Sequence, residues 1–188
     1  MKNQQDKRLE TIVLGGGCFW CLEAVFLDVD GVTAVQSGYA GGHVDAPSYE
    51  AVCGGDTGHA EVVNVTFDPA VIRYSEILEI FFATHDPTQL NRQGNDVGMQ
   101  YRSVIFTHSD EQARIAAAVR DELAARRLHD APIVTQIEPL DGNYWPADAY
   151  HQNYFSNHPT QGYCSSVIAP KVAKFRQGFA HRLKSRRA

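Results

Sequence analysis

Two cysteines, Cys18 and Cys21, stand three positions apart at the end of the segment GGGCFWC. The apolar run 11–14 before the glycines predicts a buried strand, and the spacing of apolar residues after Cys18 predicts a helix. Glycines at this junction let the backbone turn tightly and leave the sulfur uncovered. Because a thiolate is the reactive form of cysteine and a helix N-terminus lowers a thiol pKa, we expect Cys18 to be a nucleophile. The intervening Phe19 and Trp20 favour walls of an apolar pocket, although core packing explains Phe19 equally well.

Three other functions use motifs that resemble parts of the same segment, and the first two lack residues that they need. A dinucleotide-binding loop needs G-x-G-x-x-G, but Trp20 occupies the place of the third glycine. A zinc site lacks a second close pair, because Cys53 and Cys164 are isolated in the sequence. A thioredoxin-like disulfide oxidoreductase using the CFWC pair stays open as the alternative, since C-x-x-C after a strand is typical of that class. Such an enzyme needs little beyond the cysteine pair, whereas this chain also has two glycine-rich loops that carry carboxyl and tyrosine side chains. These loops argue against the alternative.

Glu61 begins a segment of alternating side chains that predicts a strand over 61–68. Its same-face neighbours Val63, Val65 and Phe67 are expected to be buried. Burial disfavours a charged carboxylate, so the pKa of Glu61 should rise, and a carboxyl that stays protonated near neutral pH can donate a proton. The pattern alone also allows a solvent-facing Glu61 at the strand edge.

The remaining elements predict how these residues are positioned. Further strands are expected at 11–14, 32–37, 102–107 and 132–138, and helices after Cys18, at 75–84, at 109–127 and from about 170. Ser109 and Gln112 form a capping box at the start of the third helix. The order βαββαβ, followed by αβ, predicts an α+β two-layer sandwich with a ferredoxin-like split βαβ core. Long glycine-rich loops, one of them carrying Cys53, and an irregular C-terminal segment complete this prediction.

Length and charge limit the possible partners. We expect the 188 residues to form one domain, with a catalytic core at about 10–164 and a basic C-terminal helix and tail at about 170–188. The net charge of -5 gives no reason to expect nucleic acid or an anionic membrane as partner. The basic end is interpreted as a solvated helix face and chain end. The polar N-terminus has no apolar signal core, so we expect a cytoplasmic protein without a membrane partner.

Several longer strings of residues follow one another along the sequence. These are GCFWC, GYAGG, SYEAVC, GDTGHAEVV, HDPTQLNRQGNDVGMQYRS, YHQ and QGYC. From about residue 11 to 164, the chain resembles the A-type peptide methionine sulfoxide reductases. The resemblance implies reduction of the S epimer of methionine sulfoxide, free or in proteins. It also implies thioredoxin as electron donor and no metal or organic cofactor. We expect a monomer.

The resemblance assigns chemical roles to the residues of the first motif and to two others. It implies that Cys18 is the nucleophile and that Phe19 and Trp20 hold the S-methyl group of the substrate. Glu61 corresponds to the carboxyl group that donates the proton. Cys164 corresponds to a recycling cysteine, which forms a disulfide after Cys18 has become a sulfenic acid.

Further residues around the expected pocket correspond to groups that contact the substrate. Tyr49 and Tyr101 match hydroxyls that assist at the sulfoxide oxygen, and Asp96 matches a carboxylate that orients the substrate. We expect His151 to contact substrate or an ordered water molecule. Cys53 has no partner in this scheme and is expected to be dispensable.

The order of the recycling steps is left open by the resemblance, because many family members have glycine where this chain has Cys21. Residues three apart in a helix have Cα atoms about 5 to 6 Å apart, a distance that a disulfide accepts. We therefore expect Cys21 to attack the oxidised Cys18 first. A second disulfide between Cys21 and Cys164 would then carry the oxidation to the surface. Direct attack by Cys164 on Cys18 remains the alternative.

Overall fold

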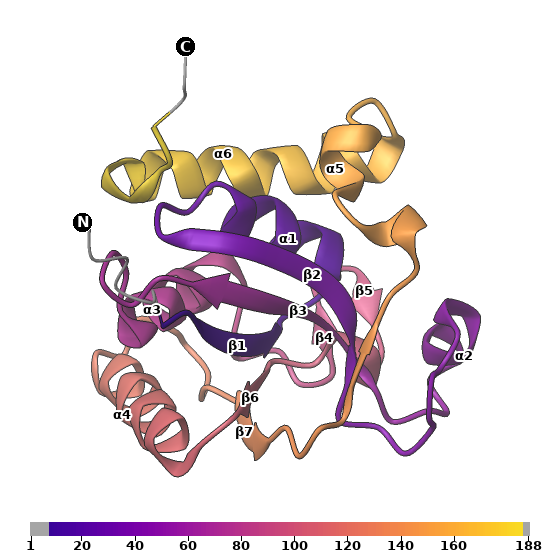
Figure 1. Ribbon diagram of the computed structural model, residues 1–188, viewed down its shortest axis with the longest axis horizontal. Coiled ribbons are helices and arrows are strands. Elements are labelled where there is room, and N and C mark those ends of the chain that lie inside the picture. The colour runs from indigo at the N-terminus through magenta and orange to yellow at the C-terminus, as the bar shows by residue number, and fades with distance from the viewer. Residues whose placement is uncertain (1–7, 186–188) are drawn as a thin grey trace, which may run out of the picture.

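One large mixed sheet, with helices packed on it, dominates the computed structural model, which describes residues 8–185 (Figure 1). The strands are β1 (Glu10–Gly15), β2 (Val32–Ala40), β3 (Ala60–Phe67), β4 (Arg92–Gln93), β5 (Asp96–Val97), β6 (Val104–Thr107), β7 (Gln136–Pro139) and β8 (Tyr144–Pro146). The α-helices are α1 (Phe19–Leu27), α2 (Tyr49–Gly54), α3 (Tyr74–Thr84), α4 (Asp110–Ala125), α5 (Tyr154–Asn157) and α6 (Ala169–Gly178). Short 3-10 and π turns link some of them.

The strand order of the large sheet is β7-β6-β1-β3-β2-β8. In its centre β3 lies between β1 and β2 and is antiparallel to both, and β6 pairs antiparallel with the other edge of β1. This arrangement is the split βαβ core predicted from the order of elements, so the ferredoxin-like α+β fold is confirmed. β7 extends the sheet parallel to β6, and β8 extends it antiparallel to β2.

Both faces of the central strands are buried, because each is covered by a separate apolar cluster. The larger cluster holds Val63, Val65 and Phe67 of β3 together with side chains of α1, α3 and α6. Figure 1 shows α6 running along the outer side of α1. The smaller cluster, on the opposite face, includes Val62 of β3 and Phe106 of β6. A strand covered on both sides offers a rigid base for any side chain at its end.

Several boundaries and local elements differ from the sequence prediction. The strand expected at 132–138 begins only at Gln136, and β8 follows it. The loop expected to carry Cys53 contains α2, so Cys53 lies on a helix rather than in a loop. Ser48 starts that helix by accepting a hydrogen bond from the Ala51 amide at 3.2 Å. The helix was missed because six residues show too little periodicity to be recognised.

The N-cap predicted at Ser109 of α4 is confirmed, but the glutamine bond of the predicted capping box goes to the residue before the cap rather than to Ser109. The Ser109 hydroxyl accepts a hydrogen bond from the amide of Gln112 at 3.2 Å, and the Gln112 side chain accepts one from the amide of His108 at 2.9 Å. The Gln112 side chain also donates to the carbonyl of Thr11 in β1 at 3.0 Å. One residue therefore both caps the helix and attaches it to the sheet.

The basic C-terminal segment is attached to the body of the protein. Arg176 pairs with Asp28 at 2.7 Å, Arg182 pairs with Glu76, and the Lys184 ammonium donates to the carbonyl of Leu27 at 2.8 Å. These three side chains attach the described part of the segment to the body of the protein, while Arg176 and Lys184 remain exposed, as a solvated helix face predicts. The final arginines, 186 and 187, lie outside the described residues.

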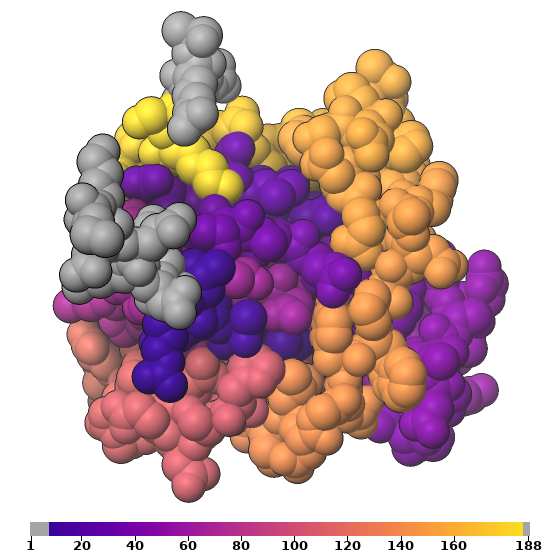
Figure 2. All heavy atoms as spheres, in the orientation of Figure 1, coloured from indigo at the N-terminus to yellow at the C-terminus, as the bar shows by residue number. Residues whose placement is uncertain are grey.

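The segment between β7 and α6 crosses the molecule beside α2. In Figure 2 it forms an orange band on the surface next to the purple atoms of the loop that carries α2. Gln152 ties this segment to β2, because its side chain accepts a hydrogen bond from the amide of Ser37 and donates to the carbonyl of the same residue, both at 2.9 Å. Within residues 8–185, no helix is both long enough and apolar enough to span a membrane.

Candidate active site

The glycine turn between β1 and α1 positions Cys18 at the N-terminal end of α1. Gly17 has a φ of +93°, a left-handed conformation that favours glycine, and a Cβ atom there would lie 2.8 Å from the side chain of Gln93. Cys18 follows as the N-cap residue, and its carbonyl accepts a hydrogen bond from the amide of Cys21 at 3.1 Å. The predicted strand-turn-helix geometry is therefore present.

The thiols of Cys18 and Cys21 are both buried, with 8% and 4% of their residue surfaces exposed. Burial raises the pKa of Cys18 well above its ordinary value, and the Cys21 thiol and the charge of Glu61 raise it further. The expectation that the helix N-terminus would lower the pKa of Cys18 was wrong, because desolvation outweighs the helix dipole at a buried thiol. The pKa of Cys21 is lowered, chiefly by its hydrogen bond with Cys18 and then by the charge of Lys171.

Glu61 lies at the start of β3 with 2% of its surface exposed, on the face that carries Val63 and Val65. The predicted burial is confirmed, and the solvent-facing alternative is wrong. One carboxyl oxygen accepts a hydrogen bond from the amide of Phe19, next to Cys18, at 3.0 Å. Burial raises the pKa of Glu61 to about 8, against the opposing effect of that hydrogen bond. The carboxyl group is therefore largely protonated at neutral pH and can donate a proton.

Replacement of Glu61 should change how stability depends on pH. Its pKa is about 8 in the folded protein, above the ordinary 4.5, so the folded state retains a proton that the unfolded chain releases between these values. This stabilisation is complete below the ordinary pKa and is lost as the pH rises through the folded pKa. We expect the free energy of unfolding of the parent to fall, relative to Glu61→Gln, by on the order of a few kcal/mol across this window. Urea denaturation at several pH values tests this, and parallel pH profiles would contradict it.

Aromatic rings surround the position next to the thiols. Phe19 is fully buried, and its ring centroid lies 5.4 Å from that of His151. The ring of His151 in turn lies 4.4 Å from that of Tyr49. Trp20 is only half-buried and stacks on Tyr154, with ring centroids 3.7 Å apart. Phe19 thus belongs to the core, as one sequence interpretation has it, and its ring also contacts the aromatic cluster; its role as a wall of a substrate pocket stays a prediction.

Two tyrosines from different elements are influenced by the charge of Glu61. Tyr49 begins α2, and Tyr101 ends the 3-10 turn Met99–Tyr101. Burial raises the pKa of both tyrosines, and the charge of Glu61 raises both further. A hydrogen bond with the side chain of Cys53 adds to the effect on Tyr49. Both hydroxyls therefore remain protonated and can donate hydrogen bonds.

Asp96 and Cys164 reach the site from later parts of the chain. Asp96, in β5, accepts a hydrogen bond from the hydroxyl of Tyr163 at 2.6 Å. Cys164 is fully buried at the start of the π turn Cys164–Ile168, which leads into α6. Burial raises the pKa of Cys164, and the charge of Cys21 adds to this. The described cysteines are all free thiols, and Cys53 alone among them is exposed.

Sequence reasoning missed residues that hold this site together. Glu23 of α1 is buried and accepts hydrogen bonds from the amides of Asn153 at 2.7 Å and Tyr154 at 3.2 Å. It fixes the segment that carries His151 against the aromatic cluster. A single acidic residue in the otherwise apolar helix FWCLEAVFL was the available signal. Tyr154 and Tyr163 carried no such signal, because their segment has no periodicity.

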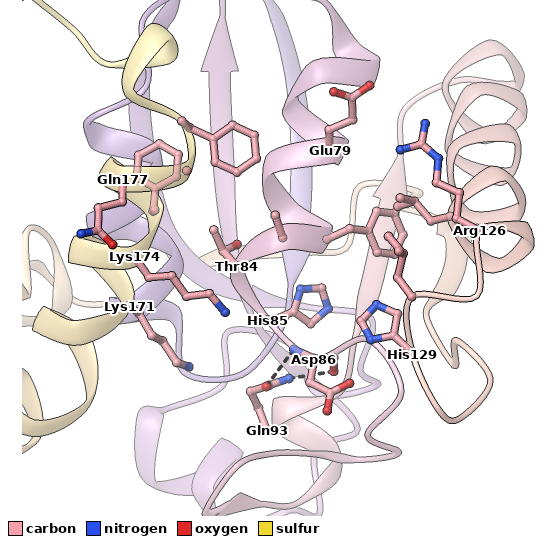
Figure 3. A pocket seen from close by; sticks show the side chains of 17 residues that line it. Glu79, Thr84, His85, Asp86, Gln93, Arg126, His129, Lys171, Lys174 and Gln177 are labelled. Carbon is pink, nitrogen blue, oxygen red and sulfur yellow. Dashed lines mark hydrogen bonds between the residues drawn. The ribbon is translucent and has the colours of Figure 1, made fainter.

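A large groove in the described surface lies away from these residues. A groove of about 990 Å³ runs between α3, the end of α4 and α6, and its lining contains none of the predicted site residues. Figure 3 shows Lys171 and Lys174 of α6 on one side of it, and Arg126 and His129 on the other. The candidate site is therefore assigned by its chemistry rather than by cavity size. Across residues 8–185, no group of three metal-ligating side chains is present.

The fold and the site define a class of protein: a thiol-based α+β enzyme in which a ferredoxin-like sheet places a buried cysteine beside a protonated carboxyl group. The chain belongs to the peptide methionine sulfoxide reductase family, whose family model matches residues 10–183. The resemblance seen in the sequence is confirmed. The match extends beyond residue 164 and includes α6.

Individual relatives agree with this assignment. The peptide methionine sulfoxide reductase MsrA of Ralstonia nicotianae is 64% identical over 184 residues, which are 96% of each chain. The crystal structure of Mxr1 from Saccharomyces cerevisiae in reduced form superimposes with a TM-score of 0.76 at 37% identity, covering 85% of this chain and 91% of that one. Mxr1 has also been solved in complex with Trx2, with a TM-score of 0.54, 28% identity and coverage of 82% and 89%.

Proposed function

We propose that this chain reduces the S epimer of methionine sulfoxide, free or in proteins, to methionine. The observation that carries the proposal is the buried carboxyl group of Glu61, held by the amide of Phe19 beside the Cys18 thiol. A sulfoxide oxygen is a poor leaving group, so attack by sulfur requires a proton at that oxygen. Glu61 is the acid that supplies it.

In the first step, Cys18 attacks the sulfur of the sulfoxide. The sulfur of the substrate is reduced and leaves as a thioether, while Cys18 is oxidised to a sulfenic acid that keeps the oxygen. Tyr49 and Tyr101 donate hydrogen bonds to this oxygen as negative charge develops on it. The raised pKa of both tyrosines supports this role, because only a protonated hydroxyl can donate.

The substrate pocket is formed by the aromatic cluster. The S-methyl group packs against Phe19 and Trp20, and the ring of His151 lies over the former at 5.4 Å between centroids. Asp96, in β5, orients the substrate. Buried aromatic walls suit a methyl group attached to sulfur, since both are apolar and polarisable.

Recycling proceeds through disulfides. Cys21 attacks the sulfenic acid of Cys18. Its position in the first turn of α1, next to Cys18, and its lowered pKa support this order. Cys164 then exchanges into a disulfide with Cys21. Thioredoxin reduces the final disulfide, an assignment supported by the complex of yeast Mxr1 with Trx2. We further propose that the protein acts as a cytoplasmic monomer without metal or organic cofactor.

The purified protein should reduce the S but not the R sulfoxide of a blocked methionine. The fixed placement of acid and aromatic walls around Cys18 allows only one arrangement of oxygen, methyl group and chain. Chromatography of the products with each epimer measures this. If the protein turns over only disulfides such as those of insulin and leaves both sulfoxides untouched, the thioredoxin-like alternative is correct instead.

Disulfide mapping after one turnover tests the order of recycling. We expect Cys164→Ser to accumulate a disulfide between Cys18 and Cys21, because the two residues lie in one helical turn, with the Cys21 amide bonded to the Cys18 carbonyl. Cys21→Ser should form the disulfide between Cys18 and Cys164 more slowly than the parent forms its first bridge. The proposed order fails if Cys164→Ser retains sulfenic acid without a bridge, while Cys21→Ser forms its disulfide at the parent rate.

A further inference from the structure

Three side chains from distant parts of the sequence form a hydrogen-bonded chain that ends at Cys21. The hydroxyl of Tyr163 lies 3.9 Å from the sulfur of Cys21 and 2.6 Å from a carboxyl oxygen of Asp96. Carboxylate oxygens accept, so Tyr163 donates its proton to Asp96. Its oxygen lone pairs are then left for the thiol of Cys21, which becomes the donor at that end.

The chain is held in place by its surroundings. Cys21 is buried in the first turn of α1, and Asp96 belongs to the small hairpin of β4 and β5. The half-buried ring of Tyr163 packs edge-on against Trp20, with centroids 6.2 Å apart. A ring fixed between two elements keeps its hydroxyl between thiol and carboxylate without further ordering cost.

We propose that Tyr163 and Asp96 form a proton relay that ionises Cys21 for its attack on the oxidised Cys18. The inference rests on the function proposed above and assigns a catalytic residue, Tyr163, to its second step. As the S–H bond of Cys21 breaks, Tyr163 takes that proton and passes its own to Asp96. The sulfur of Cys21 forms a bond to that of Cys18, whose S–O bond breaks. The hydroxide that leaves takes up a proton from solvent and becomes water, and Asp96 releases to solvent the proton that it has received. Overall, a thiol and a sulfenic acid give one disulfide and one water molecule, so the step balances.

The electrostatics around the thiol support this direction of transfer. The pKa of Cys21 is lowered, first by Cys18 and then by the charge of Lys171, while burial and the charge of Asp96 act in the opposite direction. The pKa of Tyr163 is raised by burial and by the charges of the two thiols, so this hydroxyl keeps a proton at rest. Because Tyr163 stays protonated while it is hydrogen-bonded to a carboxylate, it can accept a proton from the thiol only by giving its own proton to Asp96.

Tyr163→Phe tests the relay, because it keeps the ring and removes only the hydroxyl. In a Cys164→Ser background, rapid quenching after addition of the S sulfoxide reports two steps: methionine for the first and the disulfide of Cys18 with Cys21 for the second. We expect the second step to slow by about tenfold or more relative to the first. Asp96→Asn should slow the first step as well, because Asp96 also orients the substrate, so its second step is timed from the sulfenic acid already formed. That step should slow similarly, and the combined variant should show little additional loss in it. Tyr144→Phe, which removes a hydroxyl bonded to Gln36 on the sheet edge, is the matched control.

A structural role for Tyr163 would affect its neighbour Cys164 as well. In a Cys21→Ser background we therefore expect Tyr163→Phe to leave the rate of the disulfide of Cys18 with Cys164 unchanged. Equal slowing in both backgrounds, or no slowing in either, would overturn the relay. Absence of methionine formation in the parent would instead refute the proposed function, so the two failures are distinguishable.

Discussion

Glu61→Gln should slow the formation of methionine and of sulfenic acid by roughly 10²-fold or more in a single turnover, the scale expected for loss of a general acid. Glutamine keeps a polar side chain at the same place but cannot release a proton to the sulfoxide oxygen. The loss should appear in the chemical step rather than in substrate affinity, because the hydrogen bond to Phe19 positions the acid and not the substrate. Rapid quenching with excess enzyme measures this step directly.

Glu50→Gln is the matched control, since Glu50 is exposed in the first turn of α2, on an element that also supplies Tyr49. It should react at the parent rate. If Glu61→Gln also reacts at nearly the parent rate, Glu61 has no part in proton transfer, and its burial serves another purpose.

Removal of both recycling thiols should stop the enzyme after one turnover. We expect the Cys21→Ser/Cys164→Ser variant to release stoichiometric methionine and then to lose roughly 10²-fold or more of its steady-state activity with thioredoxin as donor. The sulfenic acid at Cys18 then lacks an internal thiol with which to condense. Steady-state assays with reduced thioredoxin measure the loss.

Cys53→Ser is the control for this experiment, because Cys53 is exposed and is not one of the proposed recycling cysteines. It should keep the parent activity. A double variant that continues to turn over with thioredoxin at the parent rate would show that the external dithiol attacks Cys18 directly, without either recycling cysteine.

The central strands of the sheet and the places of Cys18 and Glu61 could be predicted from sequence, because the signals for them are local. The glycine turn before Cys18 and the alternation that buries Glu61 depend on residues a few positions away. The pKa of Cys18 could not be predicted in this way, because it depends on how completely later segments cover the thiol. The contact of Tyr163 with Asp96 joins an irregular segment to a two-stranded hairpin, and neither has a period that indicates its partner.

The central claim is that Cys18 takes the oxygen from the sulfoxide. Mass spectrometry of the Cys21→Ser/Cys164→Ser variant, after reaction with the S sulfoxide and trapping of sulfenic acid with a carbon nucleophile, tests it most directly. We predict one trapped adduct on Cys18 for each methionine released, and neither product with the R sulfoxide. An adduct on Cys53, or methionine released without oxidation of Cys18, would contradict the account.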